Sequence, residues 1–300
     1  MACLRYVITF ILACVSMVSG LPAKAQPPEK LPVVATFSIL ADFARNVGGA
    51  RIEVTALVGP DGDTHVYQPK PADAKELRAA QLILVNGFGL EGWIDRLIKA
   101  SGTKAPVIVT TKGINPQQMR EEGRIGPDPH AWQSIANAKI YVANIRDALI
   151  AADPGGASVY RANAENYLGK LDALDKEVTA DIAKIPPGRR EIITTHDAFG
   201  YFGTAYGFRF IAPEGVSTET EASARDVAKI IRQIKAQKIP AVFLENVTDP
   251  RLVQRIATES GTKIGGTLYS DALSPPDGPA GTYIEMMRNN VKELSAALAN

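Results

Sequence analysis

Three histidines and one aspartate are the residues of this sequence best suited to binding a metal ion together. His65, His130 and His196 are its only histidines, and each lies in a turn-rich segment or directly after a β-branched run. Asp271 also follows such a run. Ligands bind at the carboxyl ends of strands in open α/β sheets, so these side chains could meet in one crevice. Three imidazoles and a carboxylate suit a borderline divalent cation. Their spacing alone leaves open that they are ordinary core or surface residues.

Two series of short β-branched runs, alternating with helical segments, are expected to position these side chains. The first series predicts strands at 33–39, 52–58, 82–85 and 107–110, and the second at 191–195, 208–211, 241–244 and 263–269. Strands that alternate with helices are typical of mainly parallel sheets covered on both faces. We therefore predict an α/β fold with two similar lobes, each built on a mainly parallel sheet.

One long, rigid helix is predicted to join the lobes. Residues 157–184 contain no proline, apolar residues recur there at helical spacing, and the sequence PPG at 186–188 ends the pattern. About 27 residues would span roughly 40 Å. The predicted organisation is a signal peptide over 1–25, an N-terminal metal-binding lobe over 26–156, a linking helix over 157–185 and a C-terminal metal-binding lobe over 186–300. A merely long surface helix is the competing interpretation.

The first 25 residues have the pattern of a secretory signal peptide. Arg5 precedes an uncharged run over 6–21, and the sequence AKA ends directly before Gln26. The run is shorter than the roughly 20 apolar residues of a spanning helix. We expect cleavage before Gln26 and export to the periplasm. The alternative is a lipoprotein attached through Cys14, with ILAC at 11–14 as a loose lipobox.

Cleavage would leave a mature chain without cysteine, because Cys3 and Cys14 are the only two. This excludes thiolate metal sites, thiol catalysis and disulfides. With Arg5 and Lys24 removed, the net charge of +1 becomes −1. A balanced charge and an aromatic content of 7% give no indication of a nucleic-acid partner.

Four segments, in order along the chain, contain these candidate ligands. They are DTHVYQP at 63–69, DPHAW at 128–132, THDAFGYF at 195–202 and YSDAL at 269–273. They resemble the metal-site segments of the cluster A-I solute-binding proteins, the extracytoplasmic zinc, manganese and iron receptors of ABC importers. The segments GVSTETEAS at 215–223 and GTY at 281–283 also resemble that family, so the resemblance covers nearly all of the mature chain.

The resemblance implies that His65, His130, His196 and Asp271 bind one divalent metal ion between two α/β lobes joined by a long helix. It implies a non-enzymatic protein that delivers the ion to a membrane permease with its ATPase. We expect the protein to be a monomer. Because the helix limits rotation of the lobes, loading is expected to order the ligand loops. The loop before His130 is expected to move most, since little apolar sequence anchors it.

Zinc is the favoured metal, manganese the next and Fe²⁺ the third. Many manganese-binding members of the family have Glu in the third ligand position, where this chain has His196. Zinc also ranks above manganese in affinity for imidazole-rich sites. However, zinc-dedicated members often carry a His-rich loop, and residues 112–126 contain no histidine.

Two other functions are alternatives. A secreted zinc-dependent hydrolase would use Asp197 or Glu245 as a general base. Against it, Asp271 would close the water position that catalytic zinc keeps open, and no HExxH helix is present. An adhesin role is attributed to some members of the family, although no residue here argues for it independently.

Overall fold

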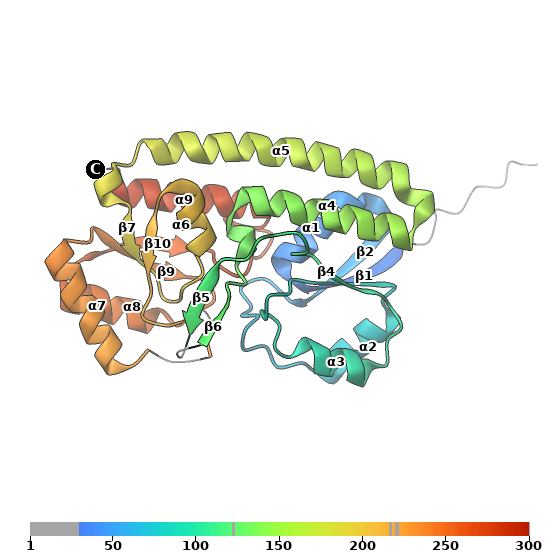
Figure 1. Cartoon of the computed structure of the whole chain (residues 1–300), viewed down its shortest axis with the longest axis horizontal. Helices are drawn as coiled ribbons and strands as arrows, with labels where there is room; N and C mark the ends of the chain where they lie inside the picture. The colour runs from blue at the N-terminus through green and yellow to red at the C-terminus, as the bar shows by residue number, and fades with distance from the viewer. Residues whose placement is uncertain (1–29, 122–123, 216–217, 220–221, 300) are drawn as a thin grey trace, which may run out of the picture.

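Two four-stranded sheets, one in each half of the chain, form the framework of the protein (Figure 1). The computed structural model describes residues 30–121, 124–215, 218–219 and 222–299. The first sheet has the order β2-β1-β3-β4 and comprises β1 (Leu31–Phe37), β2 (Ile52–Val58), β3 (Leu82–Val85) and β4 (Val107–Val109). The second has the order β10-β9-β7-β8 and comprises β7 (Glu191–Ile193), β8 (Arg209–Ile211), β9 (Ala241–Glu245) and β10 (Lys263–Leu268). All neighbouring strands in both sheets are parallel, which confirms the predicted α/β fold.

Burial follows the position of each strand in its sheet. The central strands β1 and β3 are almost entirely buried, as expected where helices cover both faces of a parallel sheet. The edge strand β4 leaves Val107 and Val109 exposed. Continuous apolar runs therefore mark the middle of the first sheet.

Helices cover both faces of the first sheet (Figure 1). On one face α2 (Pro71–Ala79) packs against α3 (Ile94–Ser101), and on the other α1 (Ser38–Gly48) packs against α4 (Ile135–Ala152). The helices of the second half are α6 (Gly200–Tyr206), α7 (Ala224–Gln237), α8 (Pro250–Ser260) and α9 (Tyr283–Leu298). Helices α7 and α8 pack together, whereas α9 packs against β10.

The predicted long helix is confirmed as α5 (Ala157–Ala183), which has 27 residues. It runs along one side of the molecule and spans both halves (Figure 1). Its buried face includes Leu171, Leu174, Val178 and Ile182, which recur at helical spacing. It packs against α1 and α4 of the first half and against α9 of the second.

A β-hairpin that the sequence analysis did not predict precedes His130. Its strands β5 (Gln118–Glu121) and β6 (Arg124–Pro127) pair antiparallel. The sequences QMRE and RIGP lack the β-branched run or strict apolar alternation that identifies a strand. The hairpin leads directly into the segment that contains His130.

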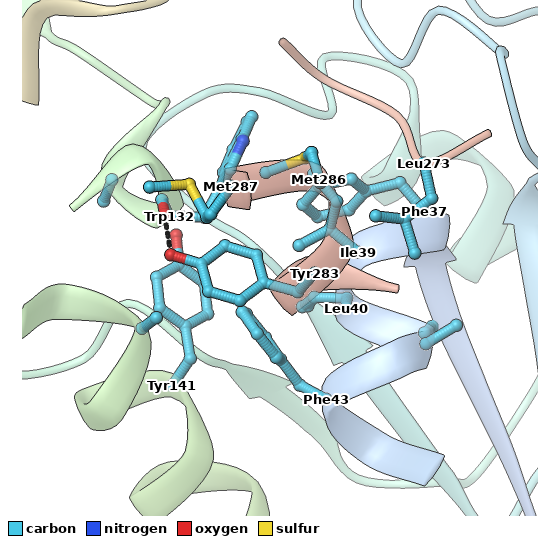
Figure 2. Packing of buried hydrophobic residues seen from close by; sticks show 14 of the residues in the cluster. Phe37, Ile39, Leu40, Phe43, Trp132, Tyr141, Leu273, Tyr283, Met286 and Met287 are labelled. Atoms are coloured by element: carbon cyan, nitrogen blue, oxygen red, sulfur yellow. Dashed lines mark hydrogen bonds between the residues drawn. The ribbon is translucent and has the colours of Figure 1, made fainter. Parts of the chain in front are cut away.

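One hydrophobic core extends through both halves (Figure 2). Tyr283, the first residue of α9, is fully buried against Phe43 of α1, with ring centroids 4.8 Å apart. Its hydroxyl donates to the carbonyl of Trp132 over 2.7 Å, and its backbone N–H donates to Asp42. The same cluster includes Phe243 of β9 and Leu268 of β10. The C-terminal helix is therefore packed into the core of the N-terminal half.

The predicted signal peptide and Cys14 lie outside the described residues. In the part of the chain that the structure describes, no helix combines the length and apolar character needed to cross a membrane. The predicted domain boundaries stay predictions. Below, "first lobe" denotes residues 30–156 and "second lobe" residues 186–299.

Stability should depend on Tyr283, because its ring connects the two lobes. Tyr283→Ala should lower the free energy of unfolding by about 3–5 kcal/mol, as for other buried aromatic residues. Tyr283→Phe keeps the ring but loses the hydrogen bond to Trp132, and should cost about 1–2 kcal/mol. Urea unfolding of the metal-free protein measures both changes, with Val159→Ala on the exposed face of α5 as control. A loss below about 1 kcal/mol for Tyr283→Ala would show that the lobes do not depend on a common core.

Candidate metal centre

His65 lies in the loop that follows β2, at the carboxyl end of the first sheet. Its backbone N–H donates to Asp63 Oδ1 over 2.9 Å, forming a tight local turn. The indole of Trp93 donates to the carbonyl of Thr64 over 2.8 Å. These bonds hold the backbone of the loop on both sides of the Thr64–His65 peptide and direct the imidazole toward the second lobe.

His130 follows the hairpin and is held by Asp128. The Oδ1 atom of Asp128 accepts from the backbone N–H of His130 over 2.9 Å and lies 2.8 Å from Nδ1 of its ring. Asn86 donates to the carbonyl of Pro129, and Tyr201 donates to that of Asp128. Polar contacts therefore anchor residues 128–130, where little apolar sequence is available to do so.

His196 follows β7 and is held by Glu245 at the end of the neighbouring strand β9. One carboxylate oxygen of Glu245 accepts from the backbone N–H groups of Thr195 and His196, over 2.7 and 2.9 Å. The other lies 2.6 Å from Nδ1 of the His196 ring. The sheet pairing of β7 with β9 thus orients this imidazole.

Asp271 lies in the loop that follows β10. The carbonyl of the preceding residue, Ser270, accepts from Trp132 Nε1 over 2.9 Å and from Gln133 Nε2 over 2.7 Å. Both donors belong to the first lobe, two and three residues after His130. The Asp271 loop is therefore fixed to the opposite lobe as well as to its own sheet.

The structure brings all four predicted residues together. One donor atom from each of His65, His130, His196 and Asp271 lies within 4.8 Å of the others. Nε2 of His65 is 3.2 Å from both Nε2 of His130 and Oδ2 of Asp271, and Nε2 of His196 is 3.1 Å from the same Oδ2. Asp271 Oδ1 is buried with no hydrogen-bond donor within the described ranges. Facing nitrogens and an unsatisfied buried oxygen are the donor arrangement that a cation would complete.

The carboxylates change the protonation of the cluster. Burial alone would lower the pKa of His196, but the attraction of Glu245 and Asp271 outweighs it, and this pKa is raised well above its usual value. The pKa of His130 is raised in the same way, through Asp271 and Asp128. Burial alone would raise the pKa of Asp271, but the charges of His196 and His130 hold it well below its usual range. Without a metal ion, these shifts favour the protonated rings of His130 and His196.

Two residues of the site were not assigned their role by sequence reasoning. Asp128 and Glu245 each contact the outer nitrogen of a histidine, which fixes the ring and leaves Nε2 facing the cluster. The spacing of Asp128 and His130, two residues apart, is a local signal that could have identified the first. No local signal exists for Glu245, because it reaches His196 from a different strand.

Known proteins are similar to this chain in both sequence and fold. The family model described as "Zinc-uptake complex component A periplasmic" (ZnuA) matches residues 33–297. The iron-binding protein YfeA of Yersinia pestis is 36% identical over 268 residues, covering 89% of this chain and 86% of that protein. The manganese-binding lipoprotein MntA of Bacillus subtilis is 35% identical over 276 residues, covering 90% of each.

Solved structures agree with this similarity. The periplasmic zinc-binding protein TroA of Treponema pallidum superposes with a TM-score of 0.86 at 32% identity, covering 90% of this chain and 100% of that one. A manganese-bound mutant of a periplasmic metal-binding protein from Candidatus Liberibacter asiaticus gives a TM-score of 0.83 at 34% identity, again over 90% of this chain and 100% of that one.

Metal affinity should fall as pH decreases, starting above the usual histidine pKa of about 6.5. A metal ion binds neutral imidazole, so it must displace the protons that the raised pKa values of His130 and His196 retain. One or two displaced protons correspond to about a 10- to 100-fold loss of affinity per pH unit. Competition titrations from pH 8 to pH 5 measure the loss, and calorimetry in two buffers counts the protons. A flat affinity between pH 7 and pH 5 would exclude the histidines as ligands.

Proposed function

Since the chain belongs to the ZnuA family and is a metal-binding, non-enzymatic substrate-binding protein of an ABC importer, we propose that its cargo is Zn²⁺. The proposed ligands are His65 and His130 from the first lobe and His196 and Asp271 from the second. The ion would be captured outside the cytoplasm and held between the lobes until it is delivered to the membrane.

The observation that carries this proposal is the close, buried arrangement of three imidazole nitrogens and one carboxylate. Zinc forms tetrahedral sites with such donors, at bond lengths of about 2.0–2.2 Å. Neighbouring donors in such a tetrahedron are roughly 3.3 Å apart. Three of the separations in this cluster are 3.1–3.2 Å, so a small shift of the side chains would accommodate the ion.

Manganese is the second candidate, and Fe²⁺ the third. MntA of Bacillus subtilis is named for manganese and YfeA for iron, so similarity alone does not select the metal. The donor set favours zinc, because imidazole suits zinc whereas carboxylate and water suit manganese. His196 is the decisive position, since it contributes a third nitrogen.

The arrangement around the cluster supports binding rather than hydrolysis. Asp271 supplies a fourth ligand where a catalytic zinc site keeps a position open for water. Glu245, considered above as a general base, contacts the outer nitrogen of His196 and therefore supports a ligand. The hydrolase alternative is not retained, and no residue of the site bears on an adhesin role.

The partners of the protein are the permease and the ATPase of its importer. We propose that it acts as a monomer and is exported with cleavage before Gln26. Attachment to the membrane through a lipid on Cys14 is the alternative. Mass spectrometry of the exported protein separates the two, because only the lipoprotein would begin at Cys14.

Substituting any proposed ligand should weaken zinc binding by about 100-fold or more, since each one supplies a quarter of the coordination shell. The variants are His65→Ala, His130→Ala, His196→Ala and Asp271→Asn, and the exposed Asp277→Asn is a matched control near Asp271. Elemental analysis should give one ion per wild-type chain, and competition titrations give the affinities. Circular dichroism checks the fold. A tight ion that survives His130→Ala would contradict the ligand assignment.

The zinc preference should depend on His196. His196→Glu replaces a nitrogen donor with an oxygen donor, and should lower the ratio of zinc affinity to manganese affinity by about tenfold or more. His196→Ala, which supplies no donor, should weaken both metals without this shift. Competition between the two ions on the same protein measures the ratio. If wild-type protein prefers manganese, or if His196→Glu leaves the ratio unchanged, zinc is not selected by this donor set.

A further inference from the structure

A tyrosine of the second lobe holds the base of the β5–β6 hairpin, which belongs to the first lobe. The N–H of Asp128 donates to the carbonyl of Gln117 over 2.8 Å, which continues the pairing of the two strands. The hydroxyl of Tyr201, in α6, accepts from the N–H of Gln117 and donates to the carbonyl of Asp128, each over 3.0 Å. One side chain of the second lobe therefore bonds to both ends of the hairpin.

Helix α6 lies directly beside this hairpin base (Figure 1). A Cβ on Gly200, the first residue of α6, would lie 2.8 Å from Oδ2 of Asp128 and 3.3 Å from Oε1 of Gln117. Nε2 of Gln117 also donates to the hydroxyl of Thr204 over 3.0 Å. Tyr201 is buried, and burial raises its pKa to about 12. Its hydroxyl therefore keeps the proton that it donates over the whole pH range in which histidines titrate.

Tyr201 is connected to two of the proposed ligands, one in each lobe. Within its own lobe it follows His196 by five residues. Across the boundary it holds the main chain of Asp128, whose Oδ1 accepts from the N–H of His130 and lies 2.8 Å from Nδ1 of its ring. A short path through Tyr201 and Asp128 thus joins the two imidazoles without passing through the cluster itself.

The peptide groups directly before His130 are bonded to both lobes. Asn86 of the first lobe donates to the carbonyl of Pro129 over 2.9 Å, whereas Tyr201 of the second lobe donates to the preceding carbonyl. Loss of the Tyr201 hydroxyl would therefore leave the connection of this segment to its own lobe intact. It would remove a connection to the lobe that carries the opposite ligands.

We propose that Tyr201 is a positioning residue of the metal centre, whose hydroxyl fixes His130 of the first lobe at the separation from His196 that allows both rings to bind one ion. This inference rests on the proposed function, because it requires both histidines to be ligands. Groups that orient a metal-binding histidine typically change metal affinity by about 10- to 100-fold. Tyr201 acts through Asp128, one residue further from the ring, so we expect an effect of about tenfold.

Tyr201→Phe tests this role, because it removes the hydroxyl and keeps the ring. Tyr206→Phe is the matched control on the same helix, since the hydroxyl of Tyr206 donates to Asp175 of α5 over 2.7 Å. Each variant loses a hydrogen bond of α6, but only the first variant changes the hairpin base. Competition titrations should show zinc binding about tenfold weaker in Tyr201→Phe and within about twofold of wild type in Tyr206→Phe. Circular dichroism checks that both variants are folded.

Double variants separate the positioning of His130 from a general loosening of the protein. In His130→Ala the ligand is absent, so adding Tyr201→Phe should change zinc affinity by no more than about twofold. In His65→Ala the ring of His130 is still present, so adding Tyr201→Phe should weaken binding by about tenfold, as in wild type. The visible spectrum of bound Co²⁺, which depends on the arrangement of the donors, should change in Tyr201→Phe and stay the same in Tyr206→Phe.

The outcomes separate this inference from the proposed function. If wild-type protein binds no zinc, or if His130→Ala binds it as tightly as wild type, the proposed function or its ligand assignment fails, and this inference fails with it. If the ligand variants behave as expected but Tyr201→Phe binds zinc like wild type, the ligand assignment stands and the role of Tyr201 is wrong. An equal loss in the His130→Ala background, a comparable loss in Tyr206→Phe or an unchanged Co²⁺ spectrum would also overturn it, since the hydroxyl would then not act through His130.

Discussion

The rest of the structure depends on the compensation of negative charge buried between the lobes. Asp128, Glu245 and Asp271 are buried around three imidazoles. A buried carboxylate is expensive unless positive charge balances it. In the metal-free cluster that charge is supplied by protons, which is why the pKa values of His130 and His196 are raised. A divalent ion would also supply positive charge, so metal binding would displace protons from His130 and His196.

The positions of the four donors follow from the fold. The two parallel sheets direct the loops after β2, β7 and β10 toward the boundary between the lobes, because the carboxyl ends of parallel strands lie at one edge. Helix α5 and the packing of Tyr283 against Phe43 hold the sheets in a common frame. A site shared by two lobes therefore does not require the lobes to move independently.

The fold alone does not determine which metal ion is preferred. Proteins named for zinc and for manganese superpose on this chain with TM-scores of 0.86 and 0.83, so the framework is compatible with either name. Selection of the metal would then rest on the donors, including the ring of His196. Glu245 orients this ring through the pairing of β7 with β9, which links the choice of donor to the geometry of the second sheet.

The sequence by itself determined the two α/β halves and the long helix, because these depend on local patterns. The candidate residues of the centre came from the resemblance of four short segments to a known family. Apolar runs identify strands, helical spacing identifies α5, and each ligand lies in a short segment with its own turn residues. The hairpin β5–β6 was not predicted, because its strands lack such a pattern. Only the tertiary structure decided that Glu245 lies behind His196 and that Tyr283 of α9 belongs to the core of the first lobe. These features depend on contacts between residues far apart in the chain, and such contacts are set by sheet order and helix packing rather than by any local spacing.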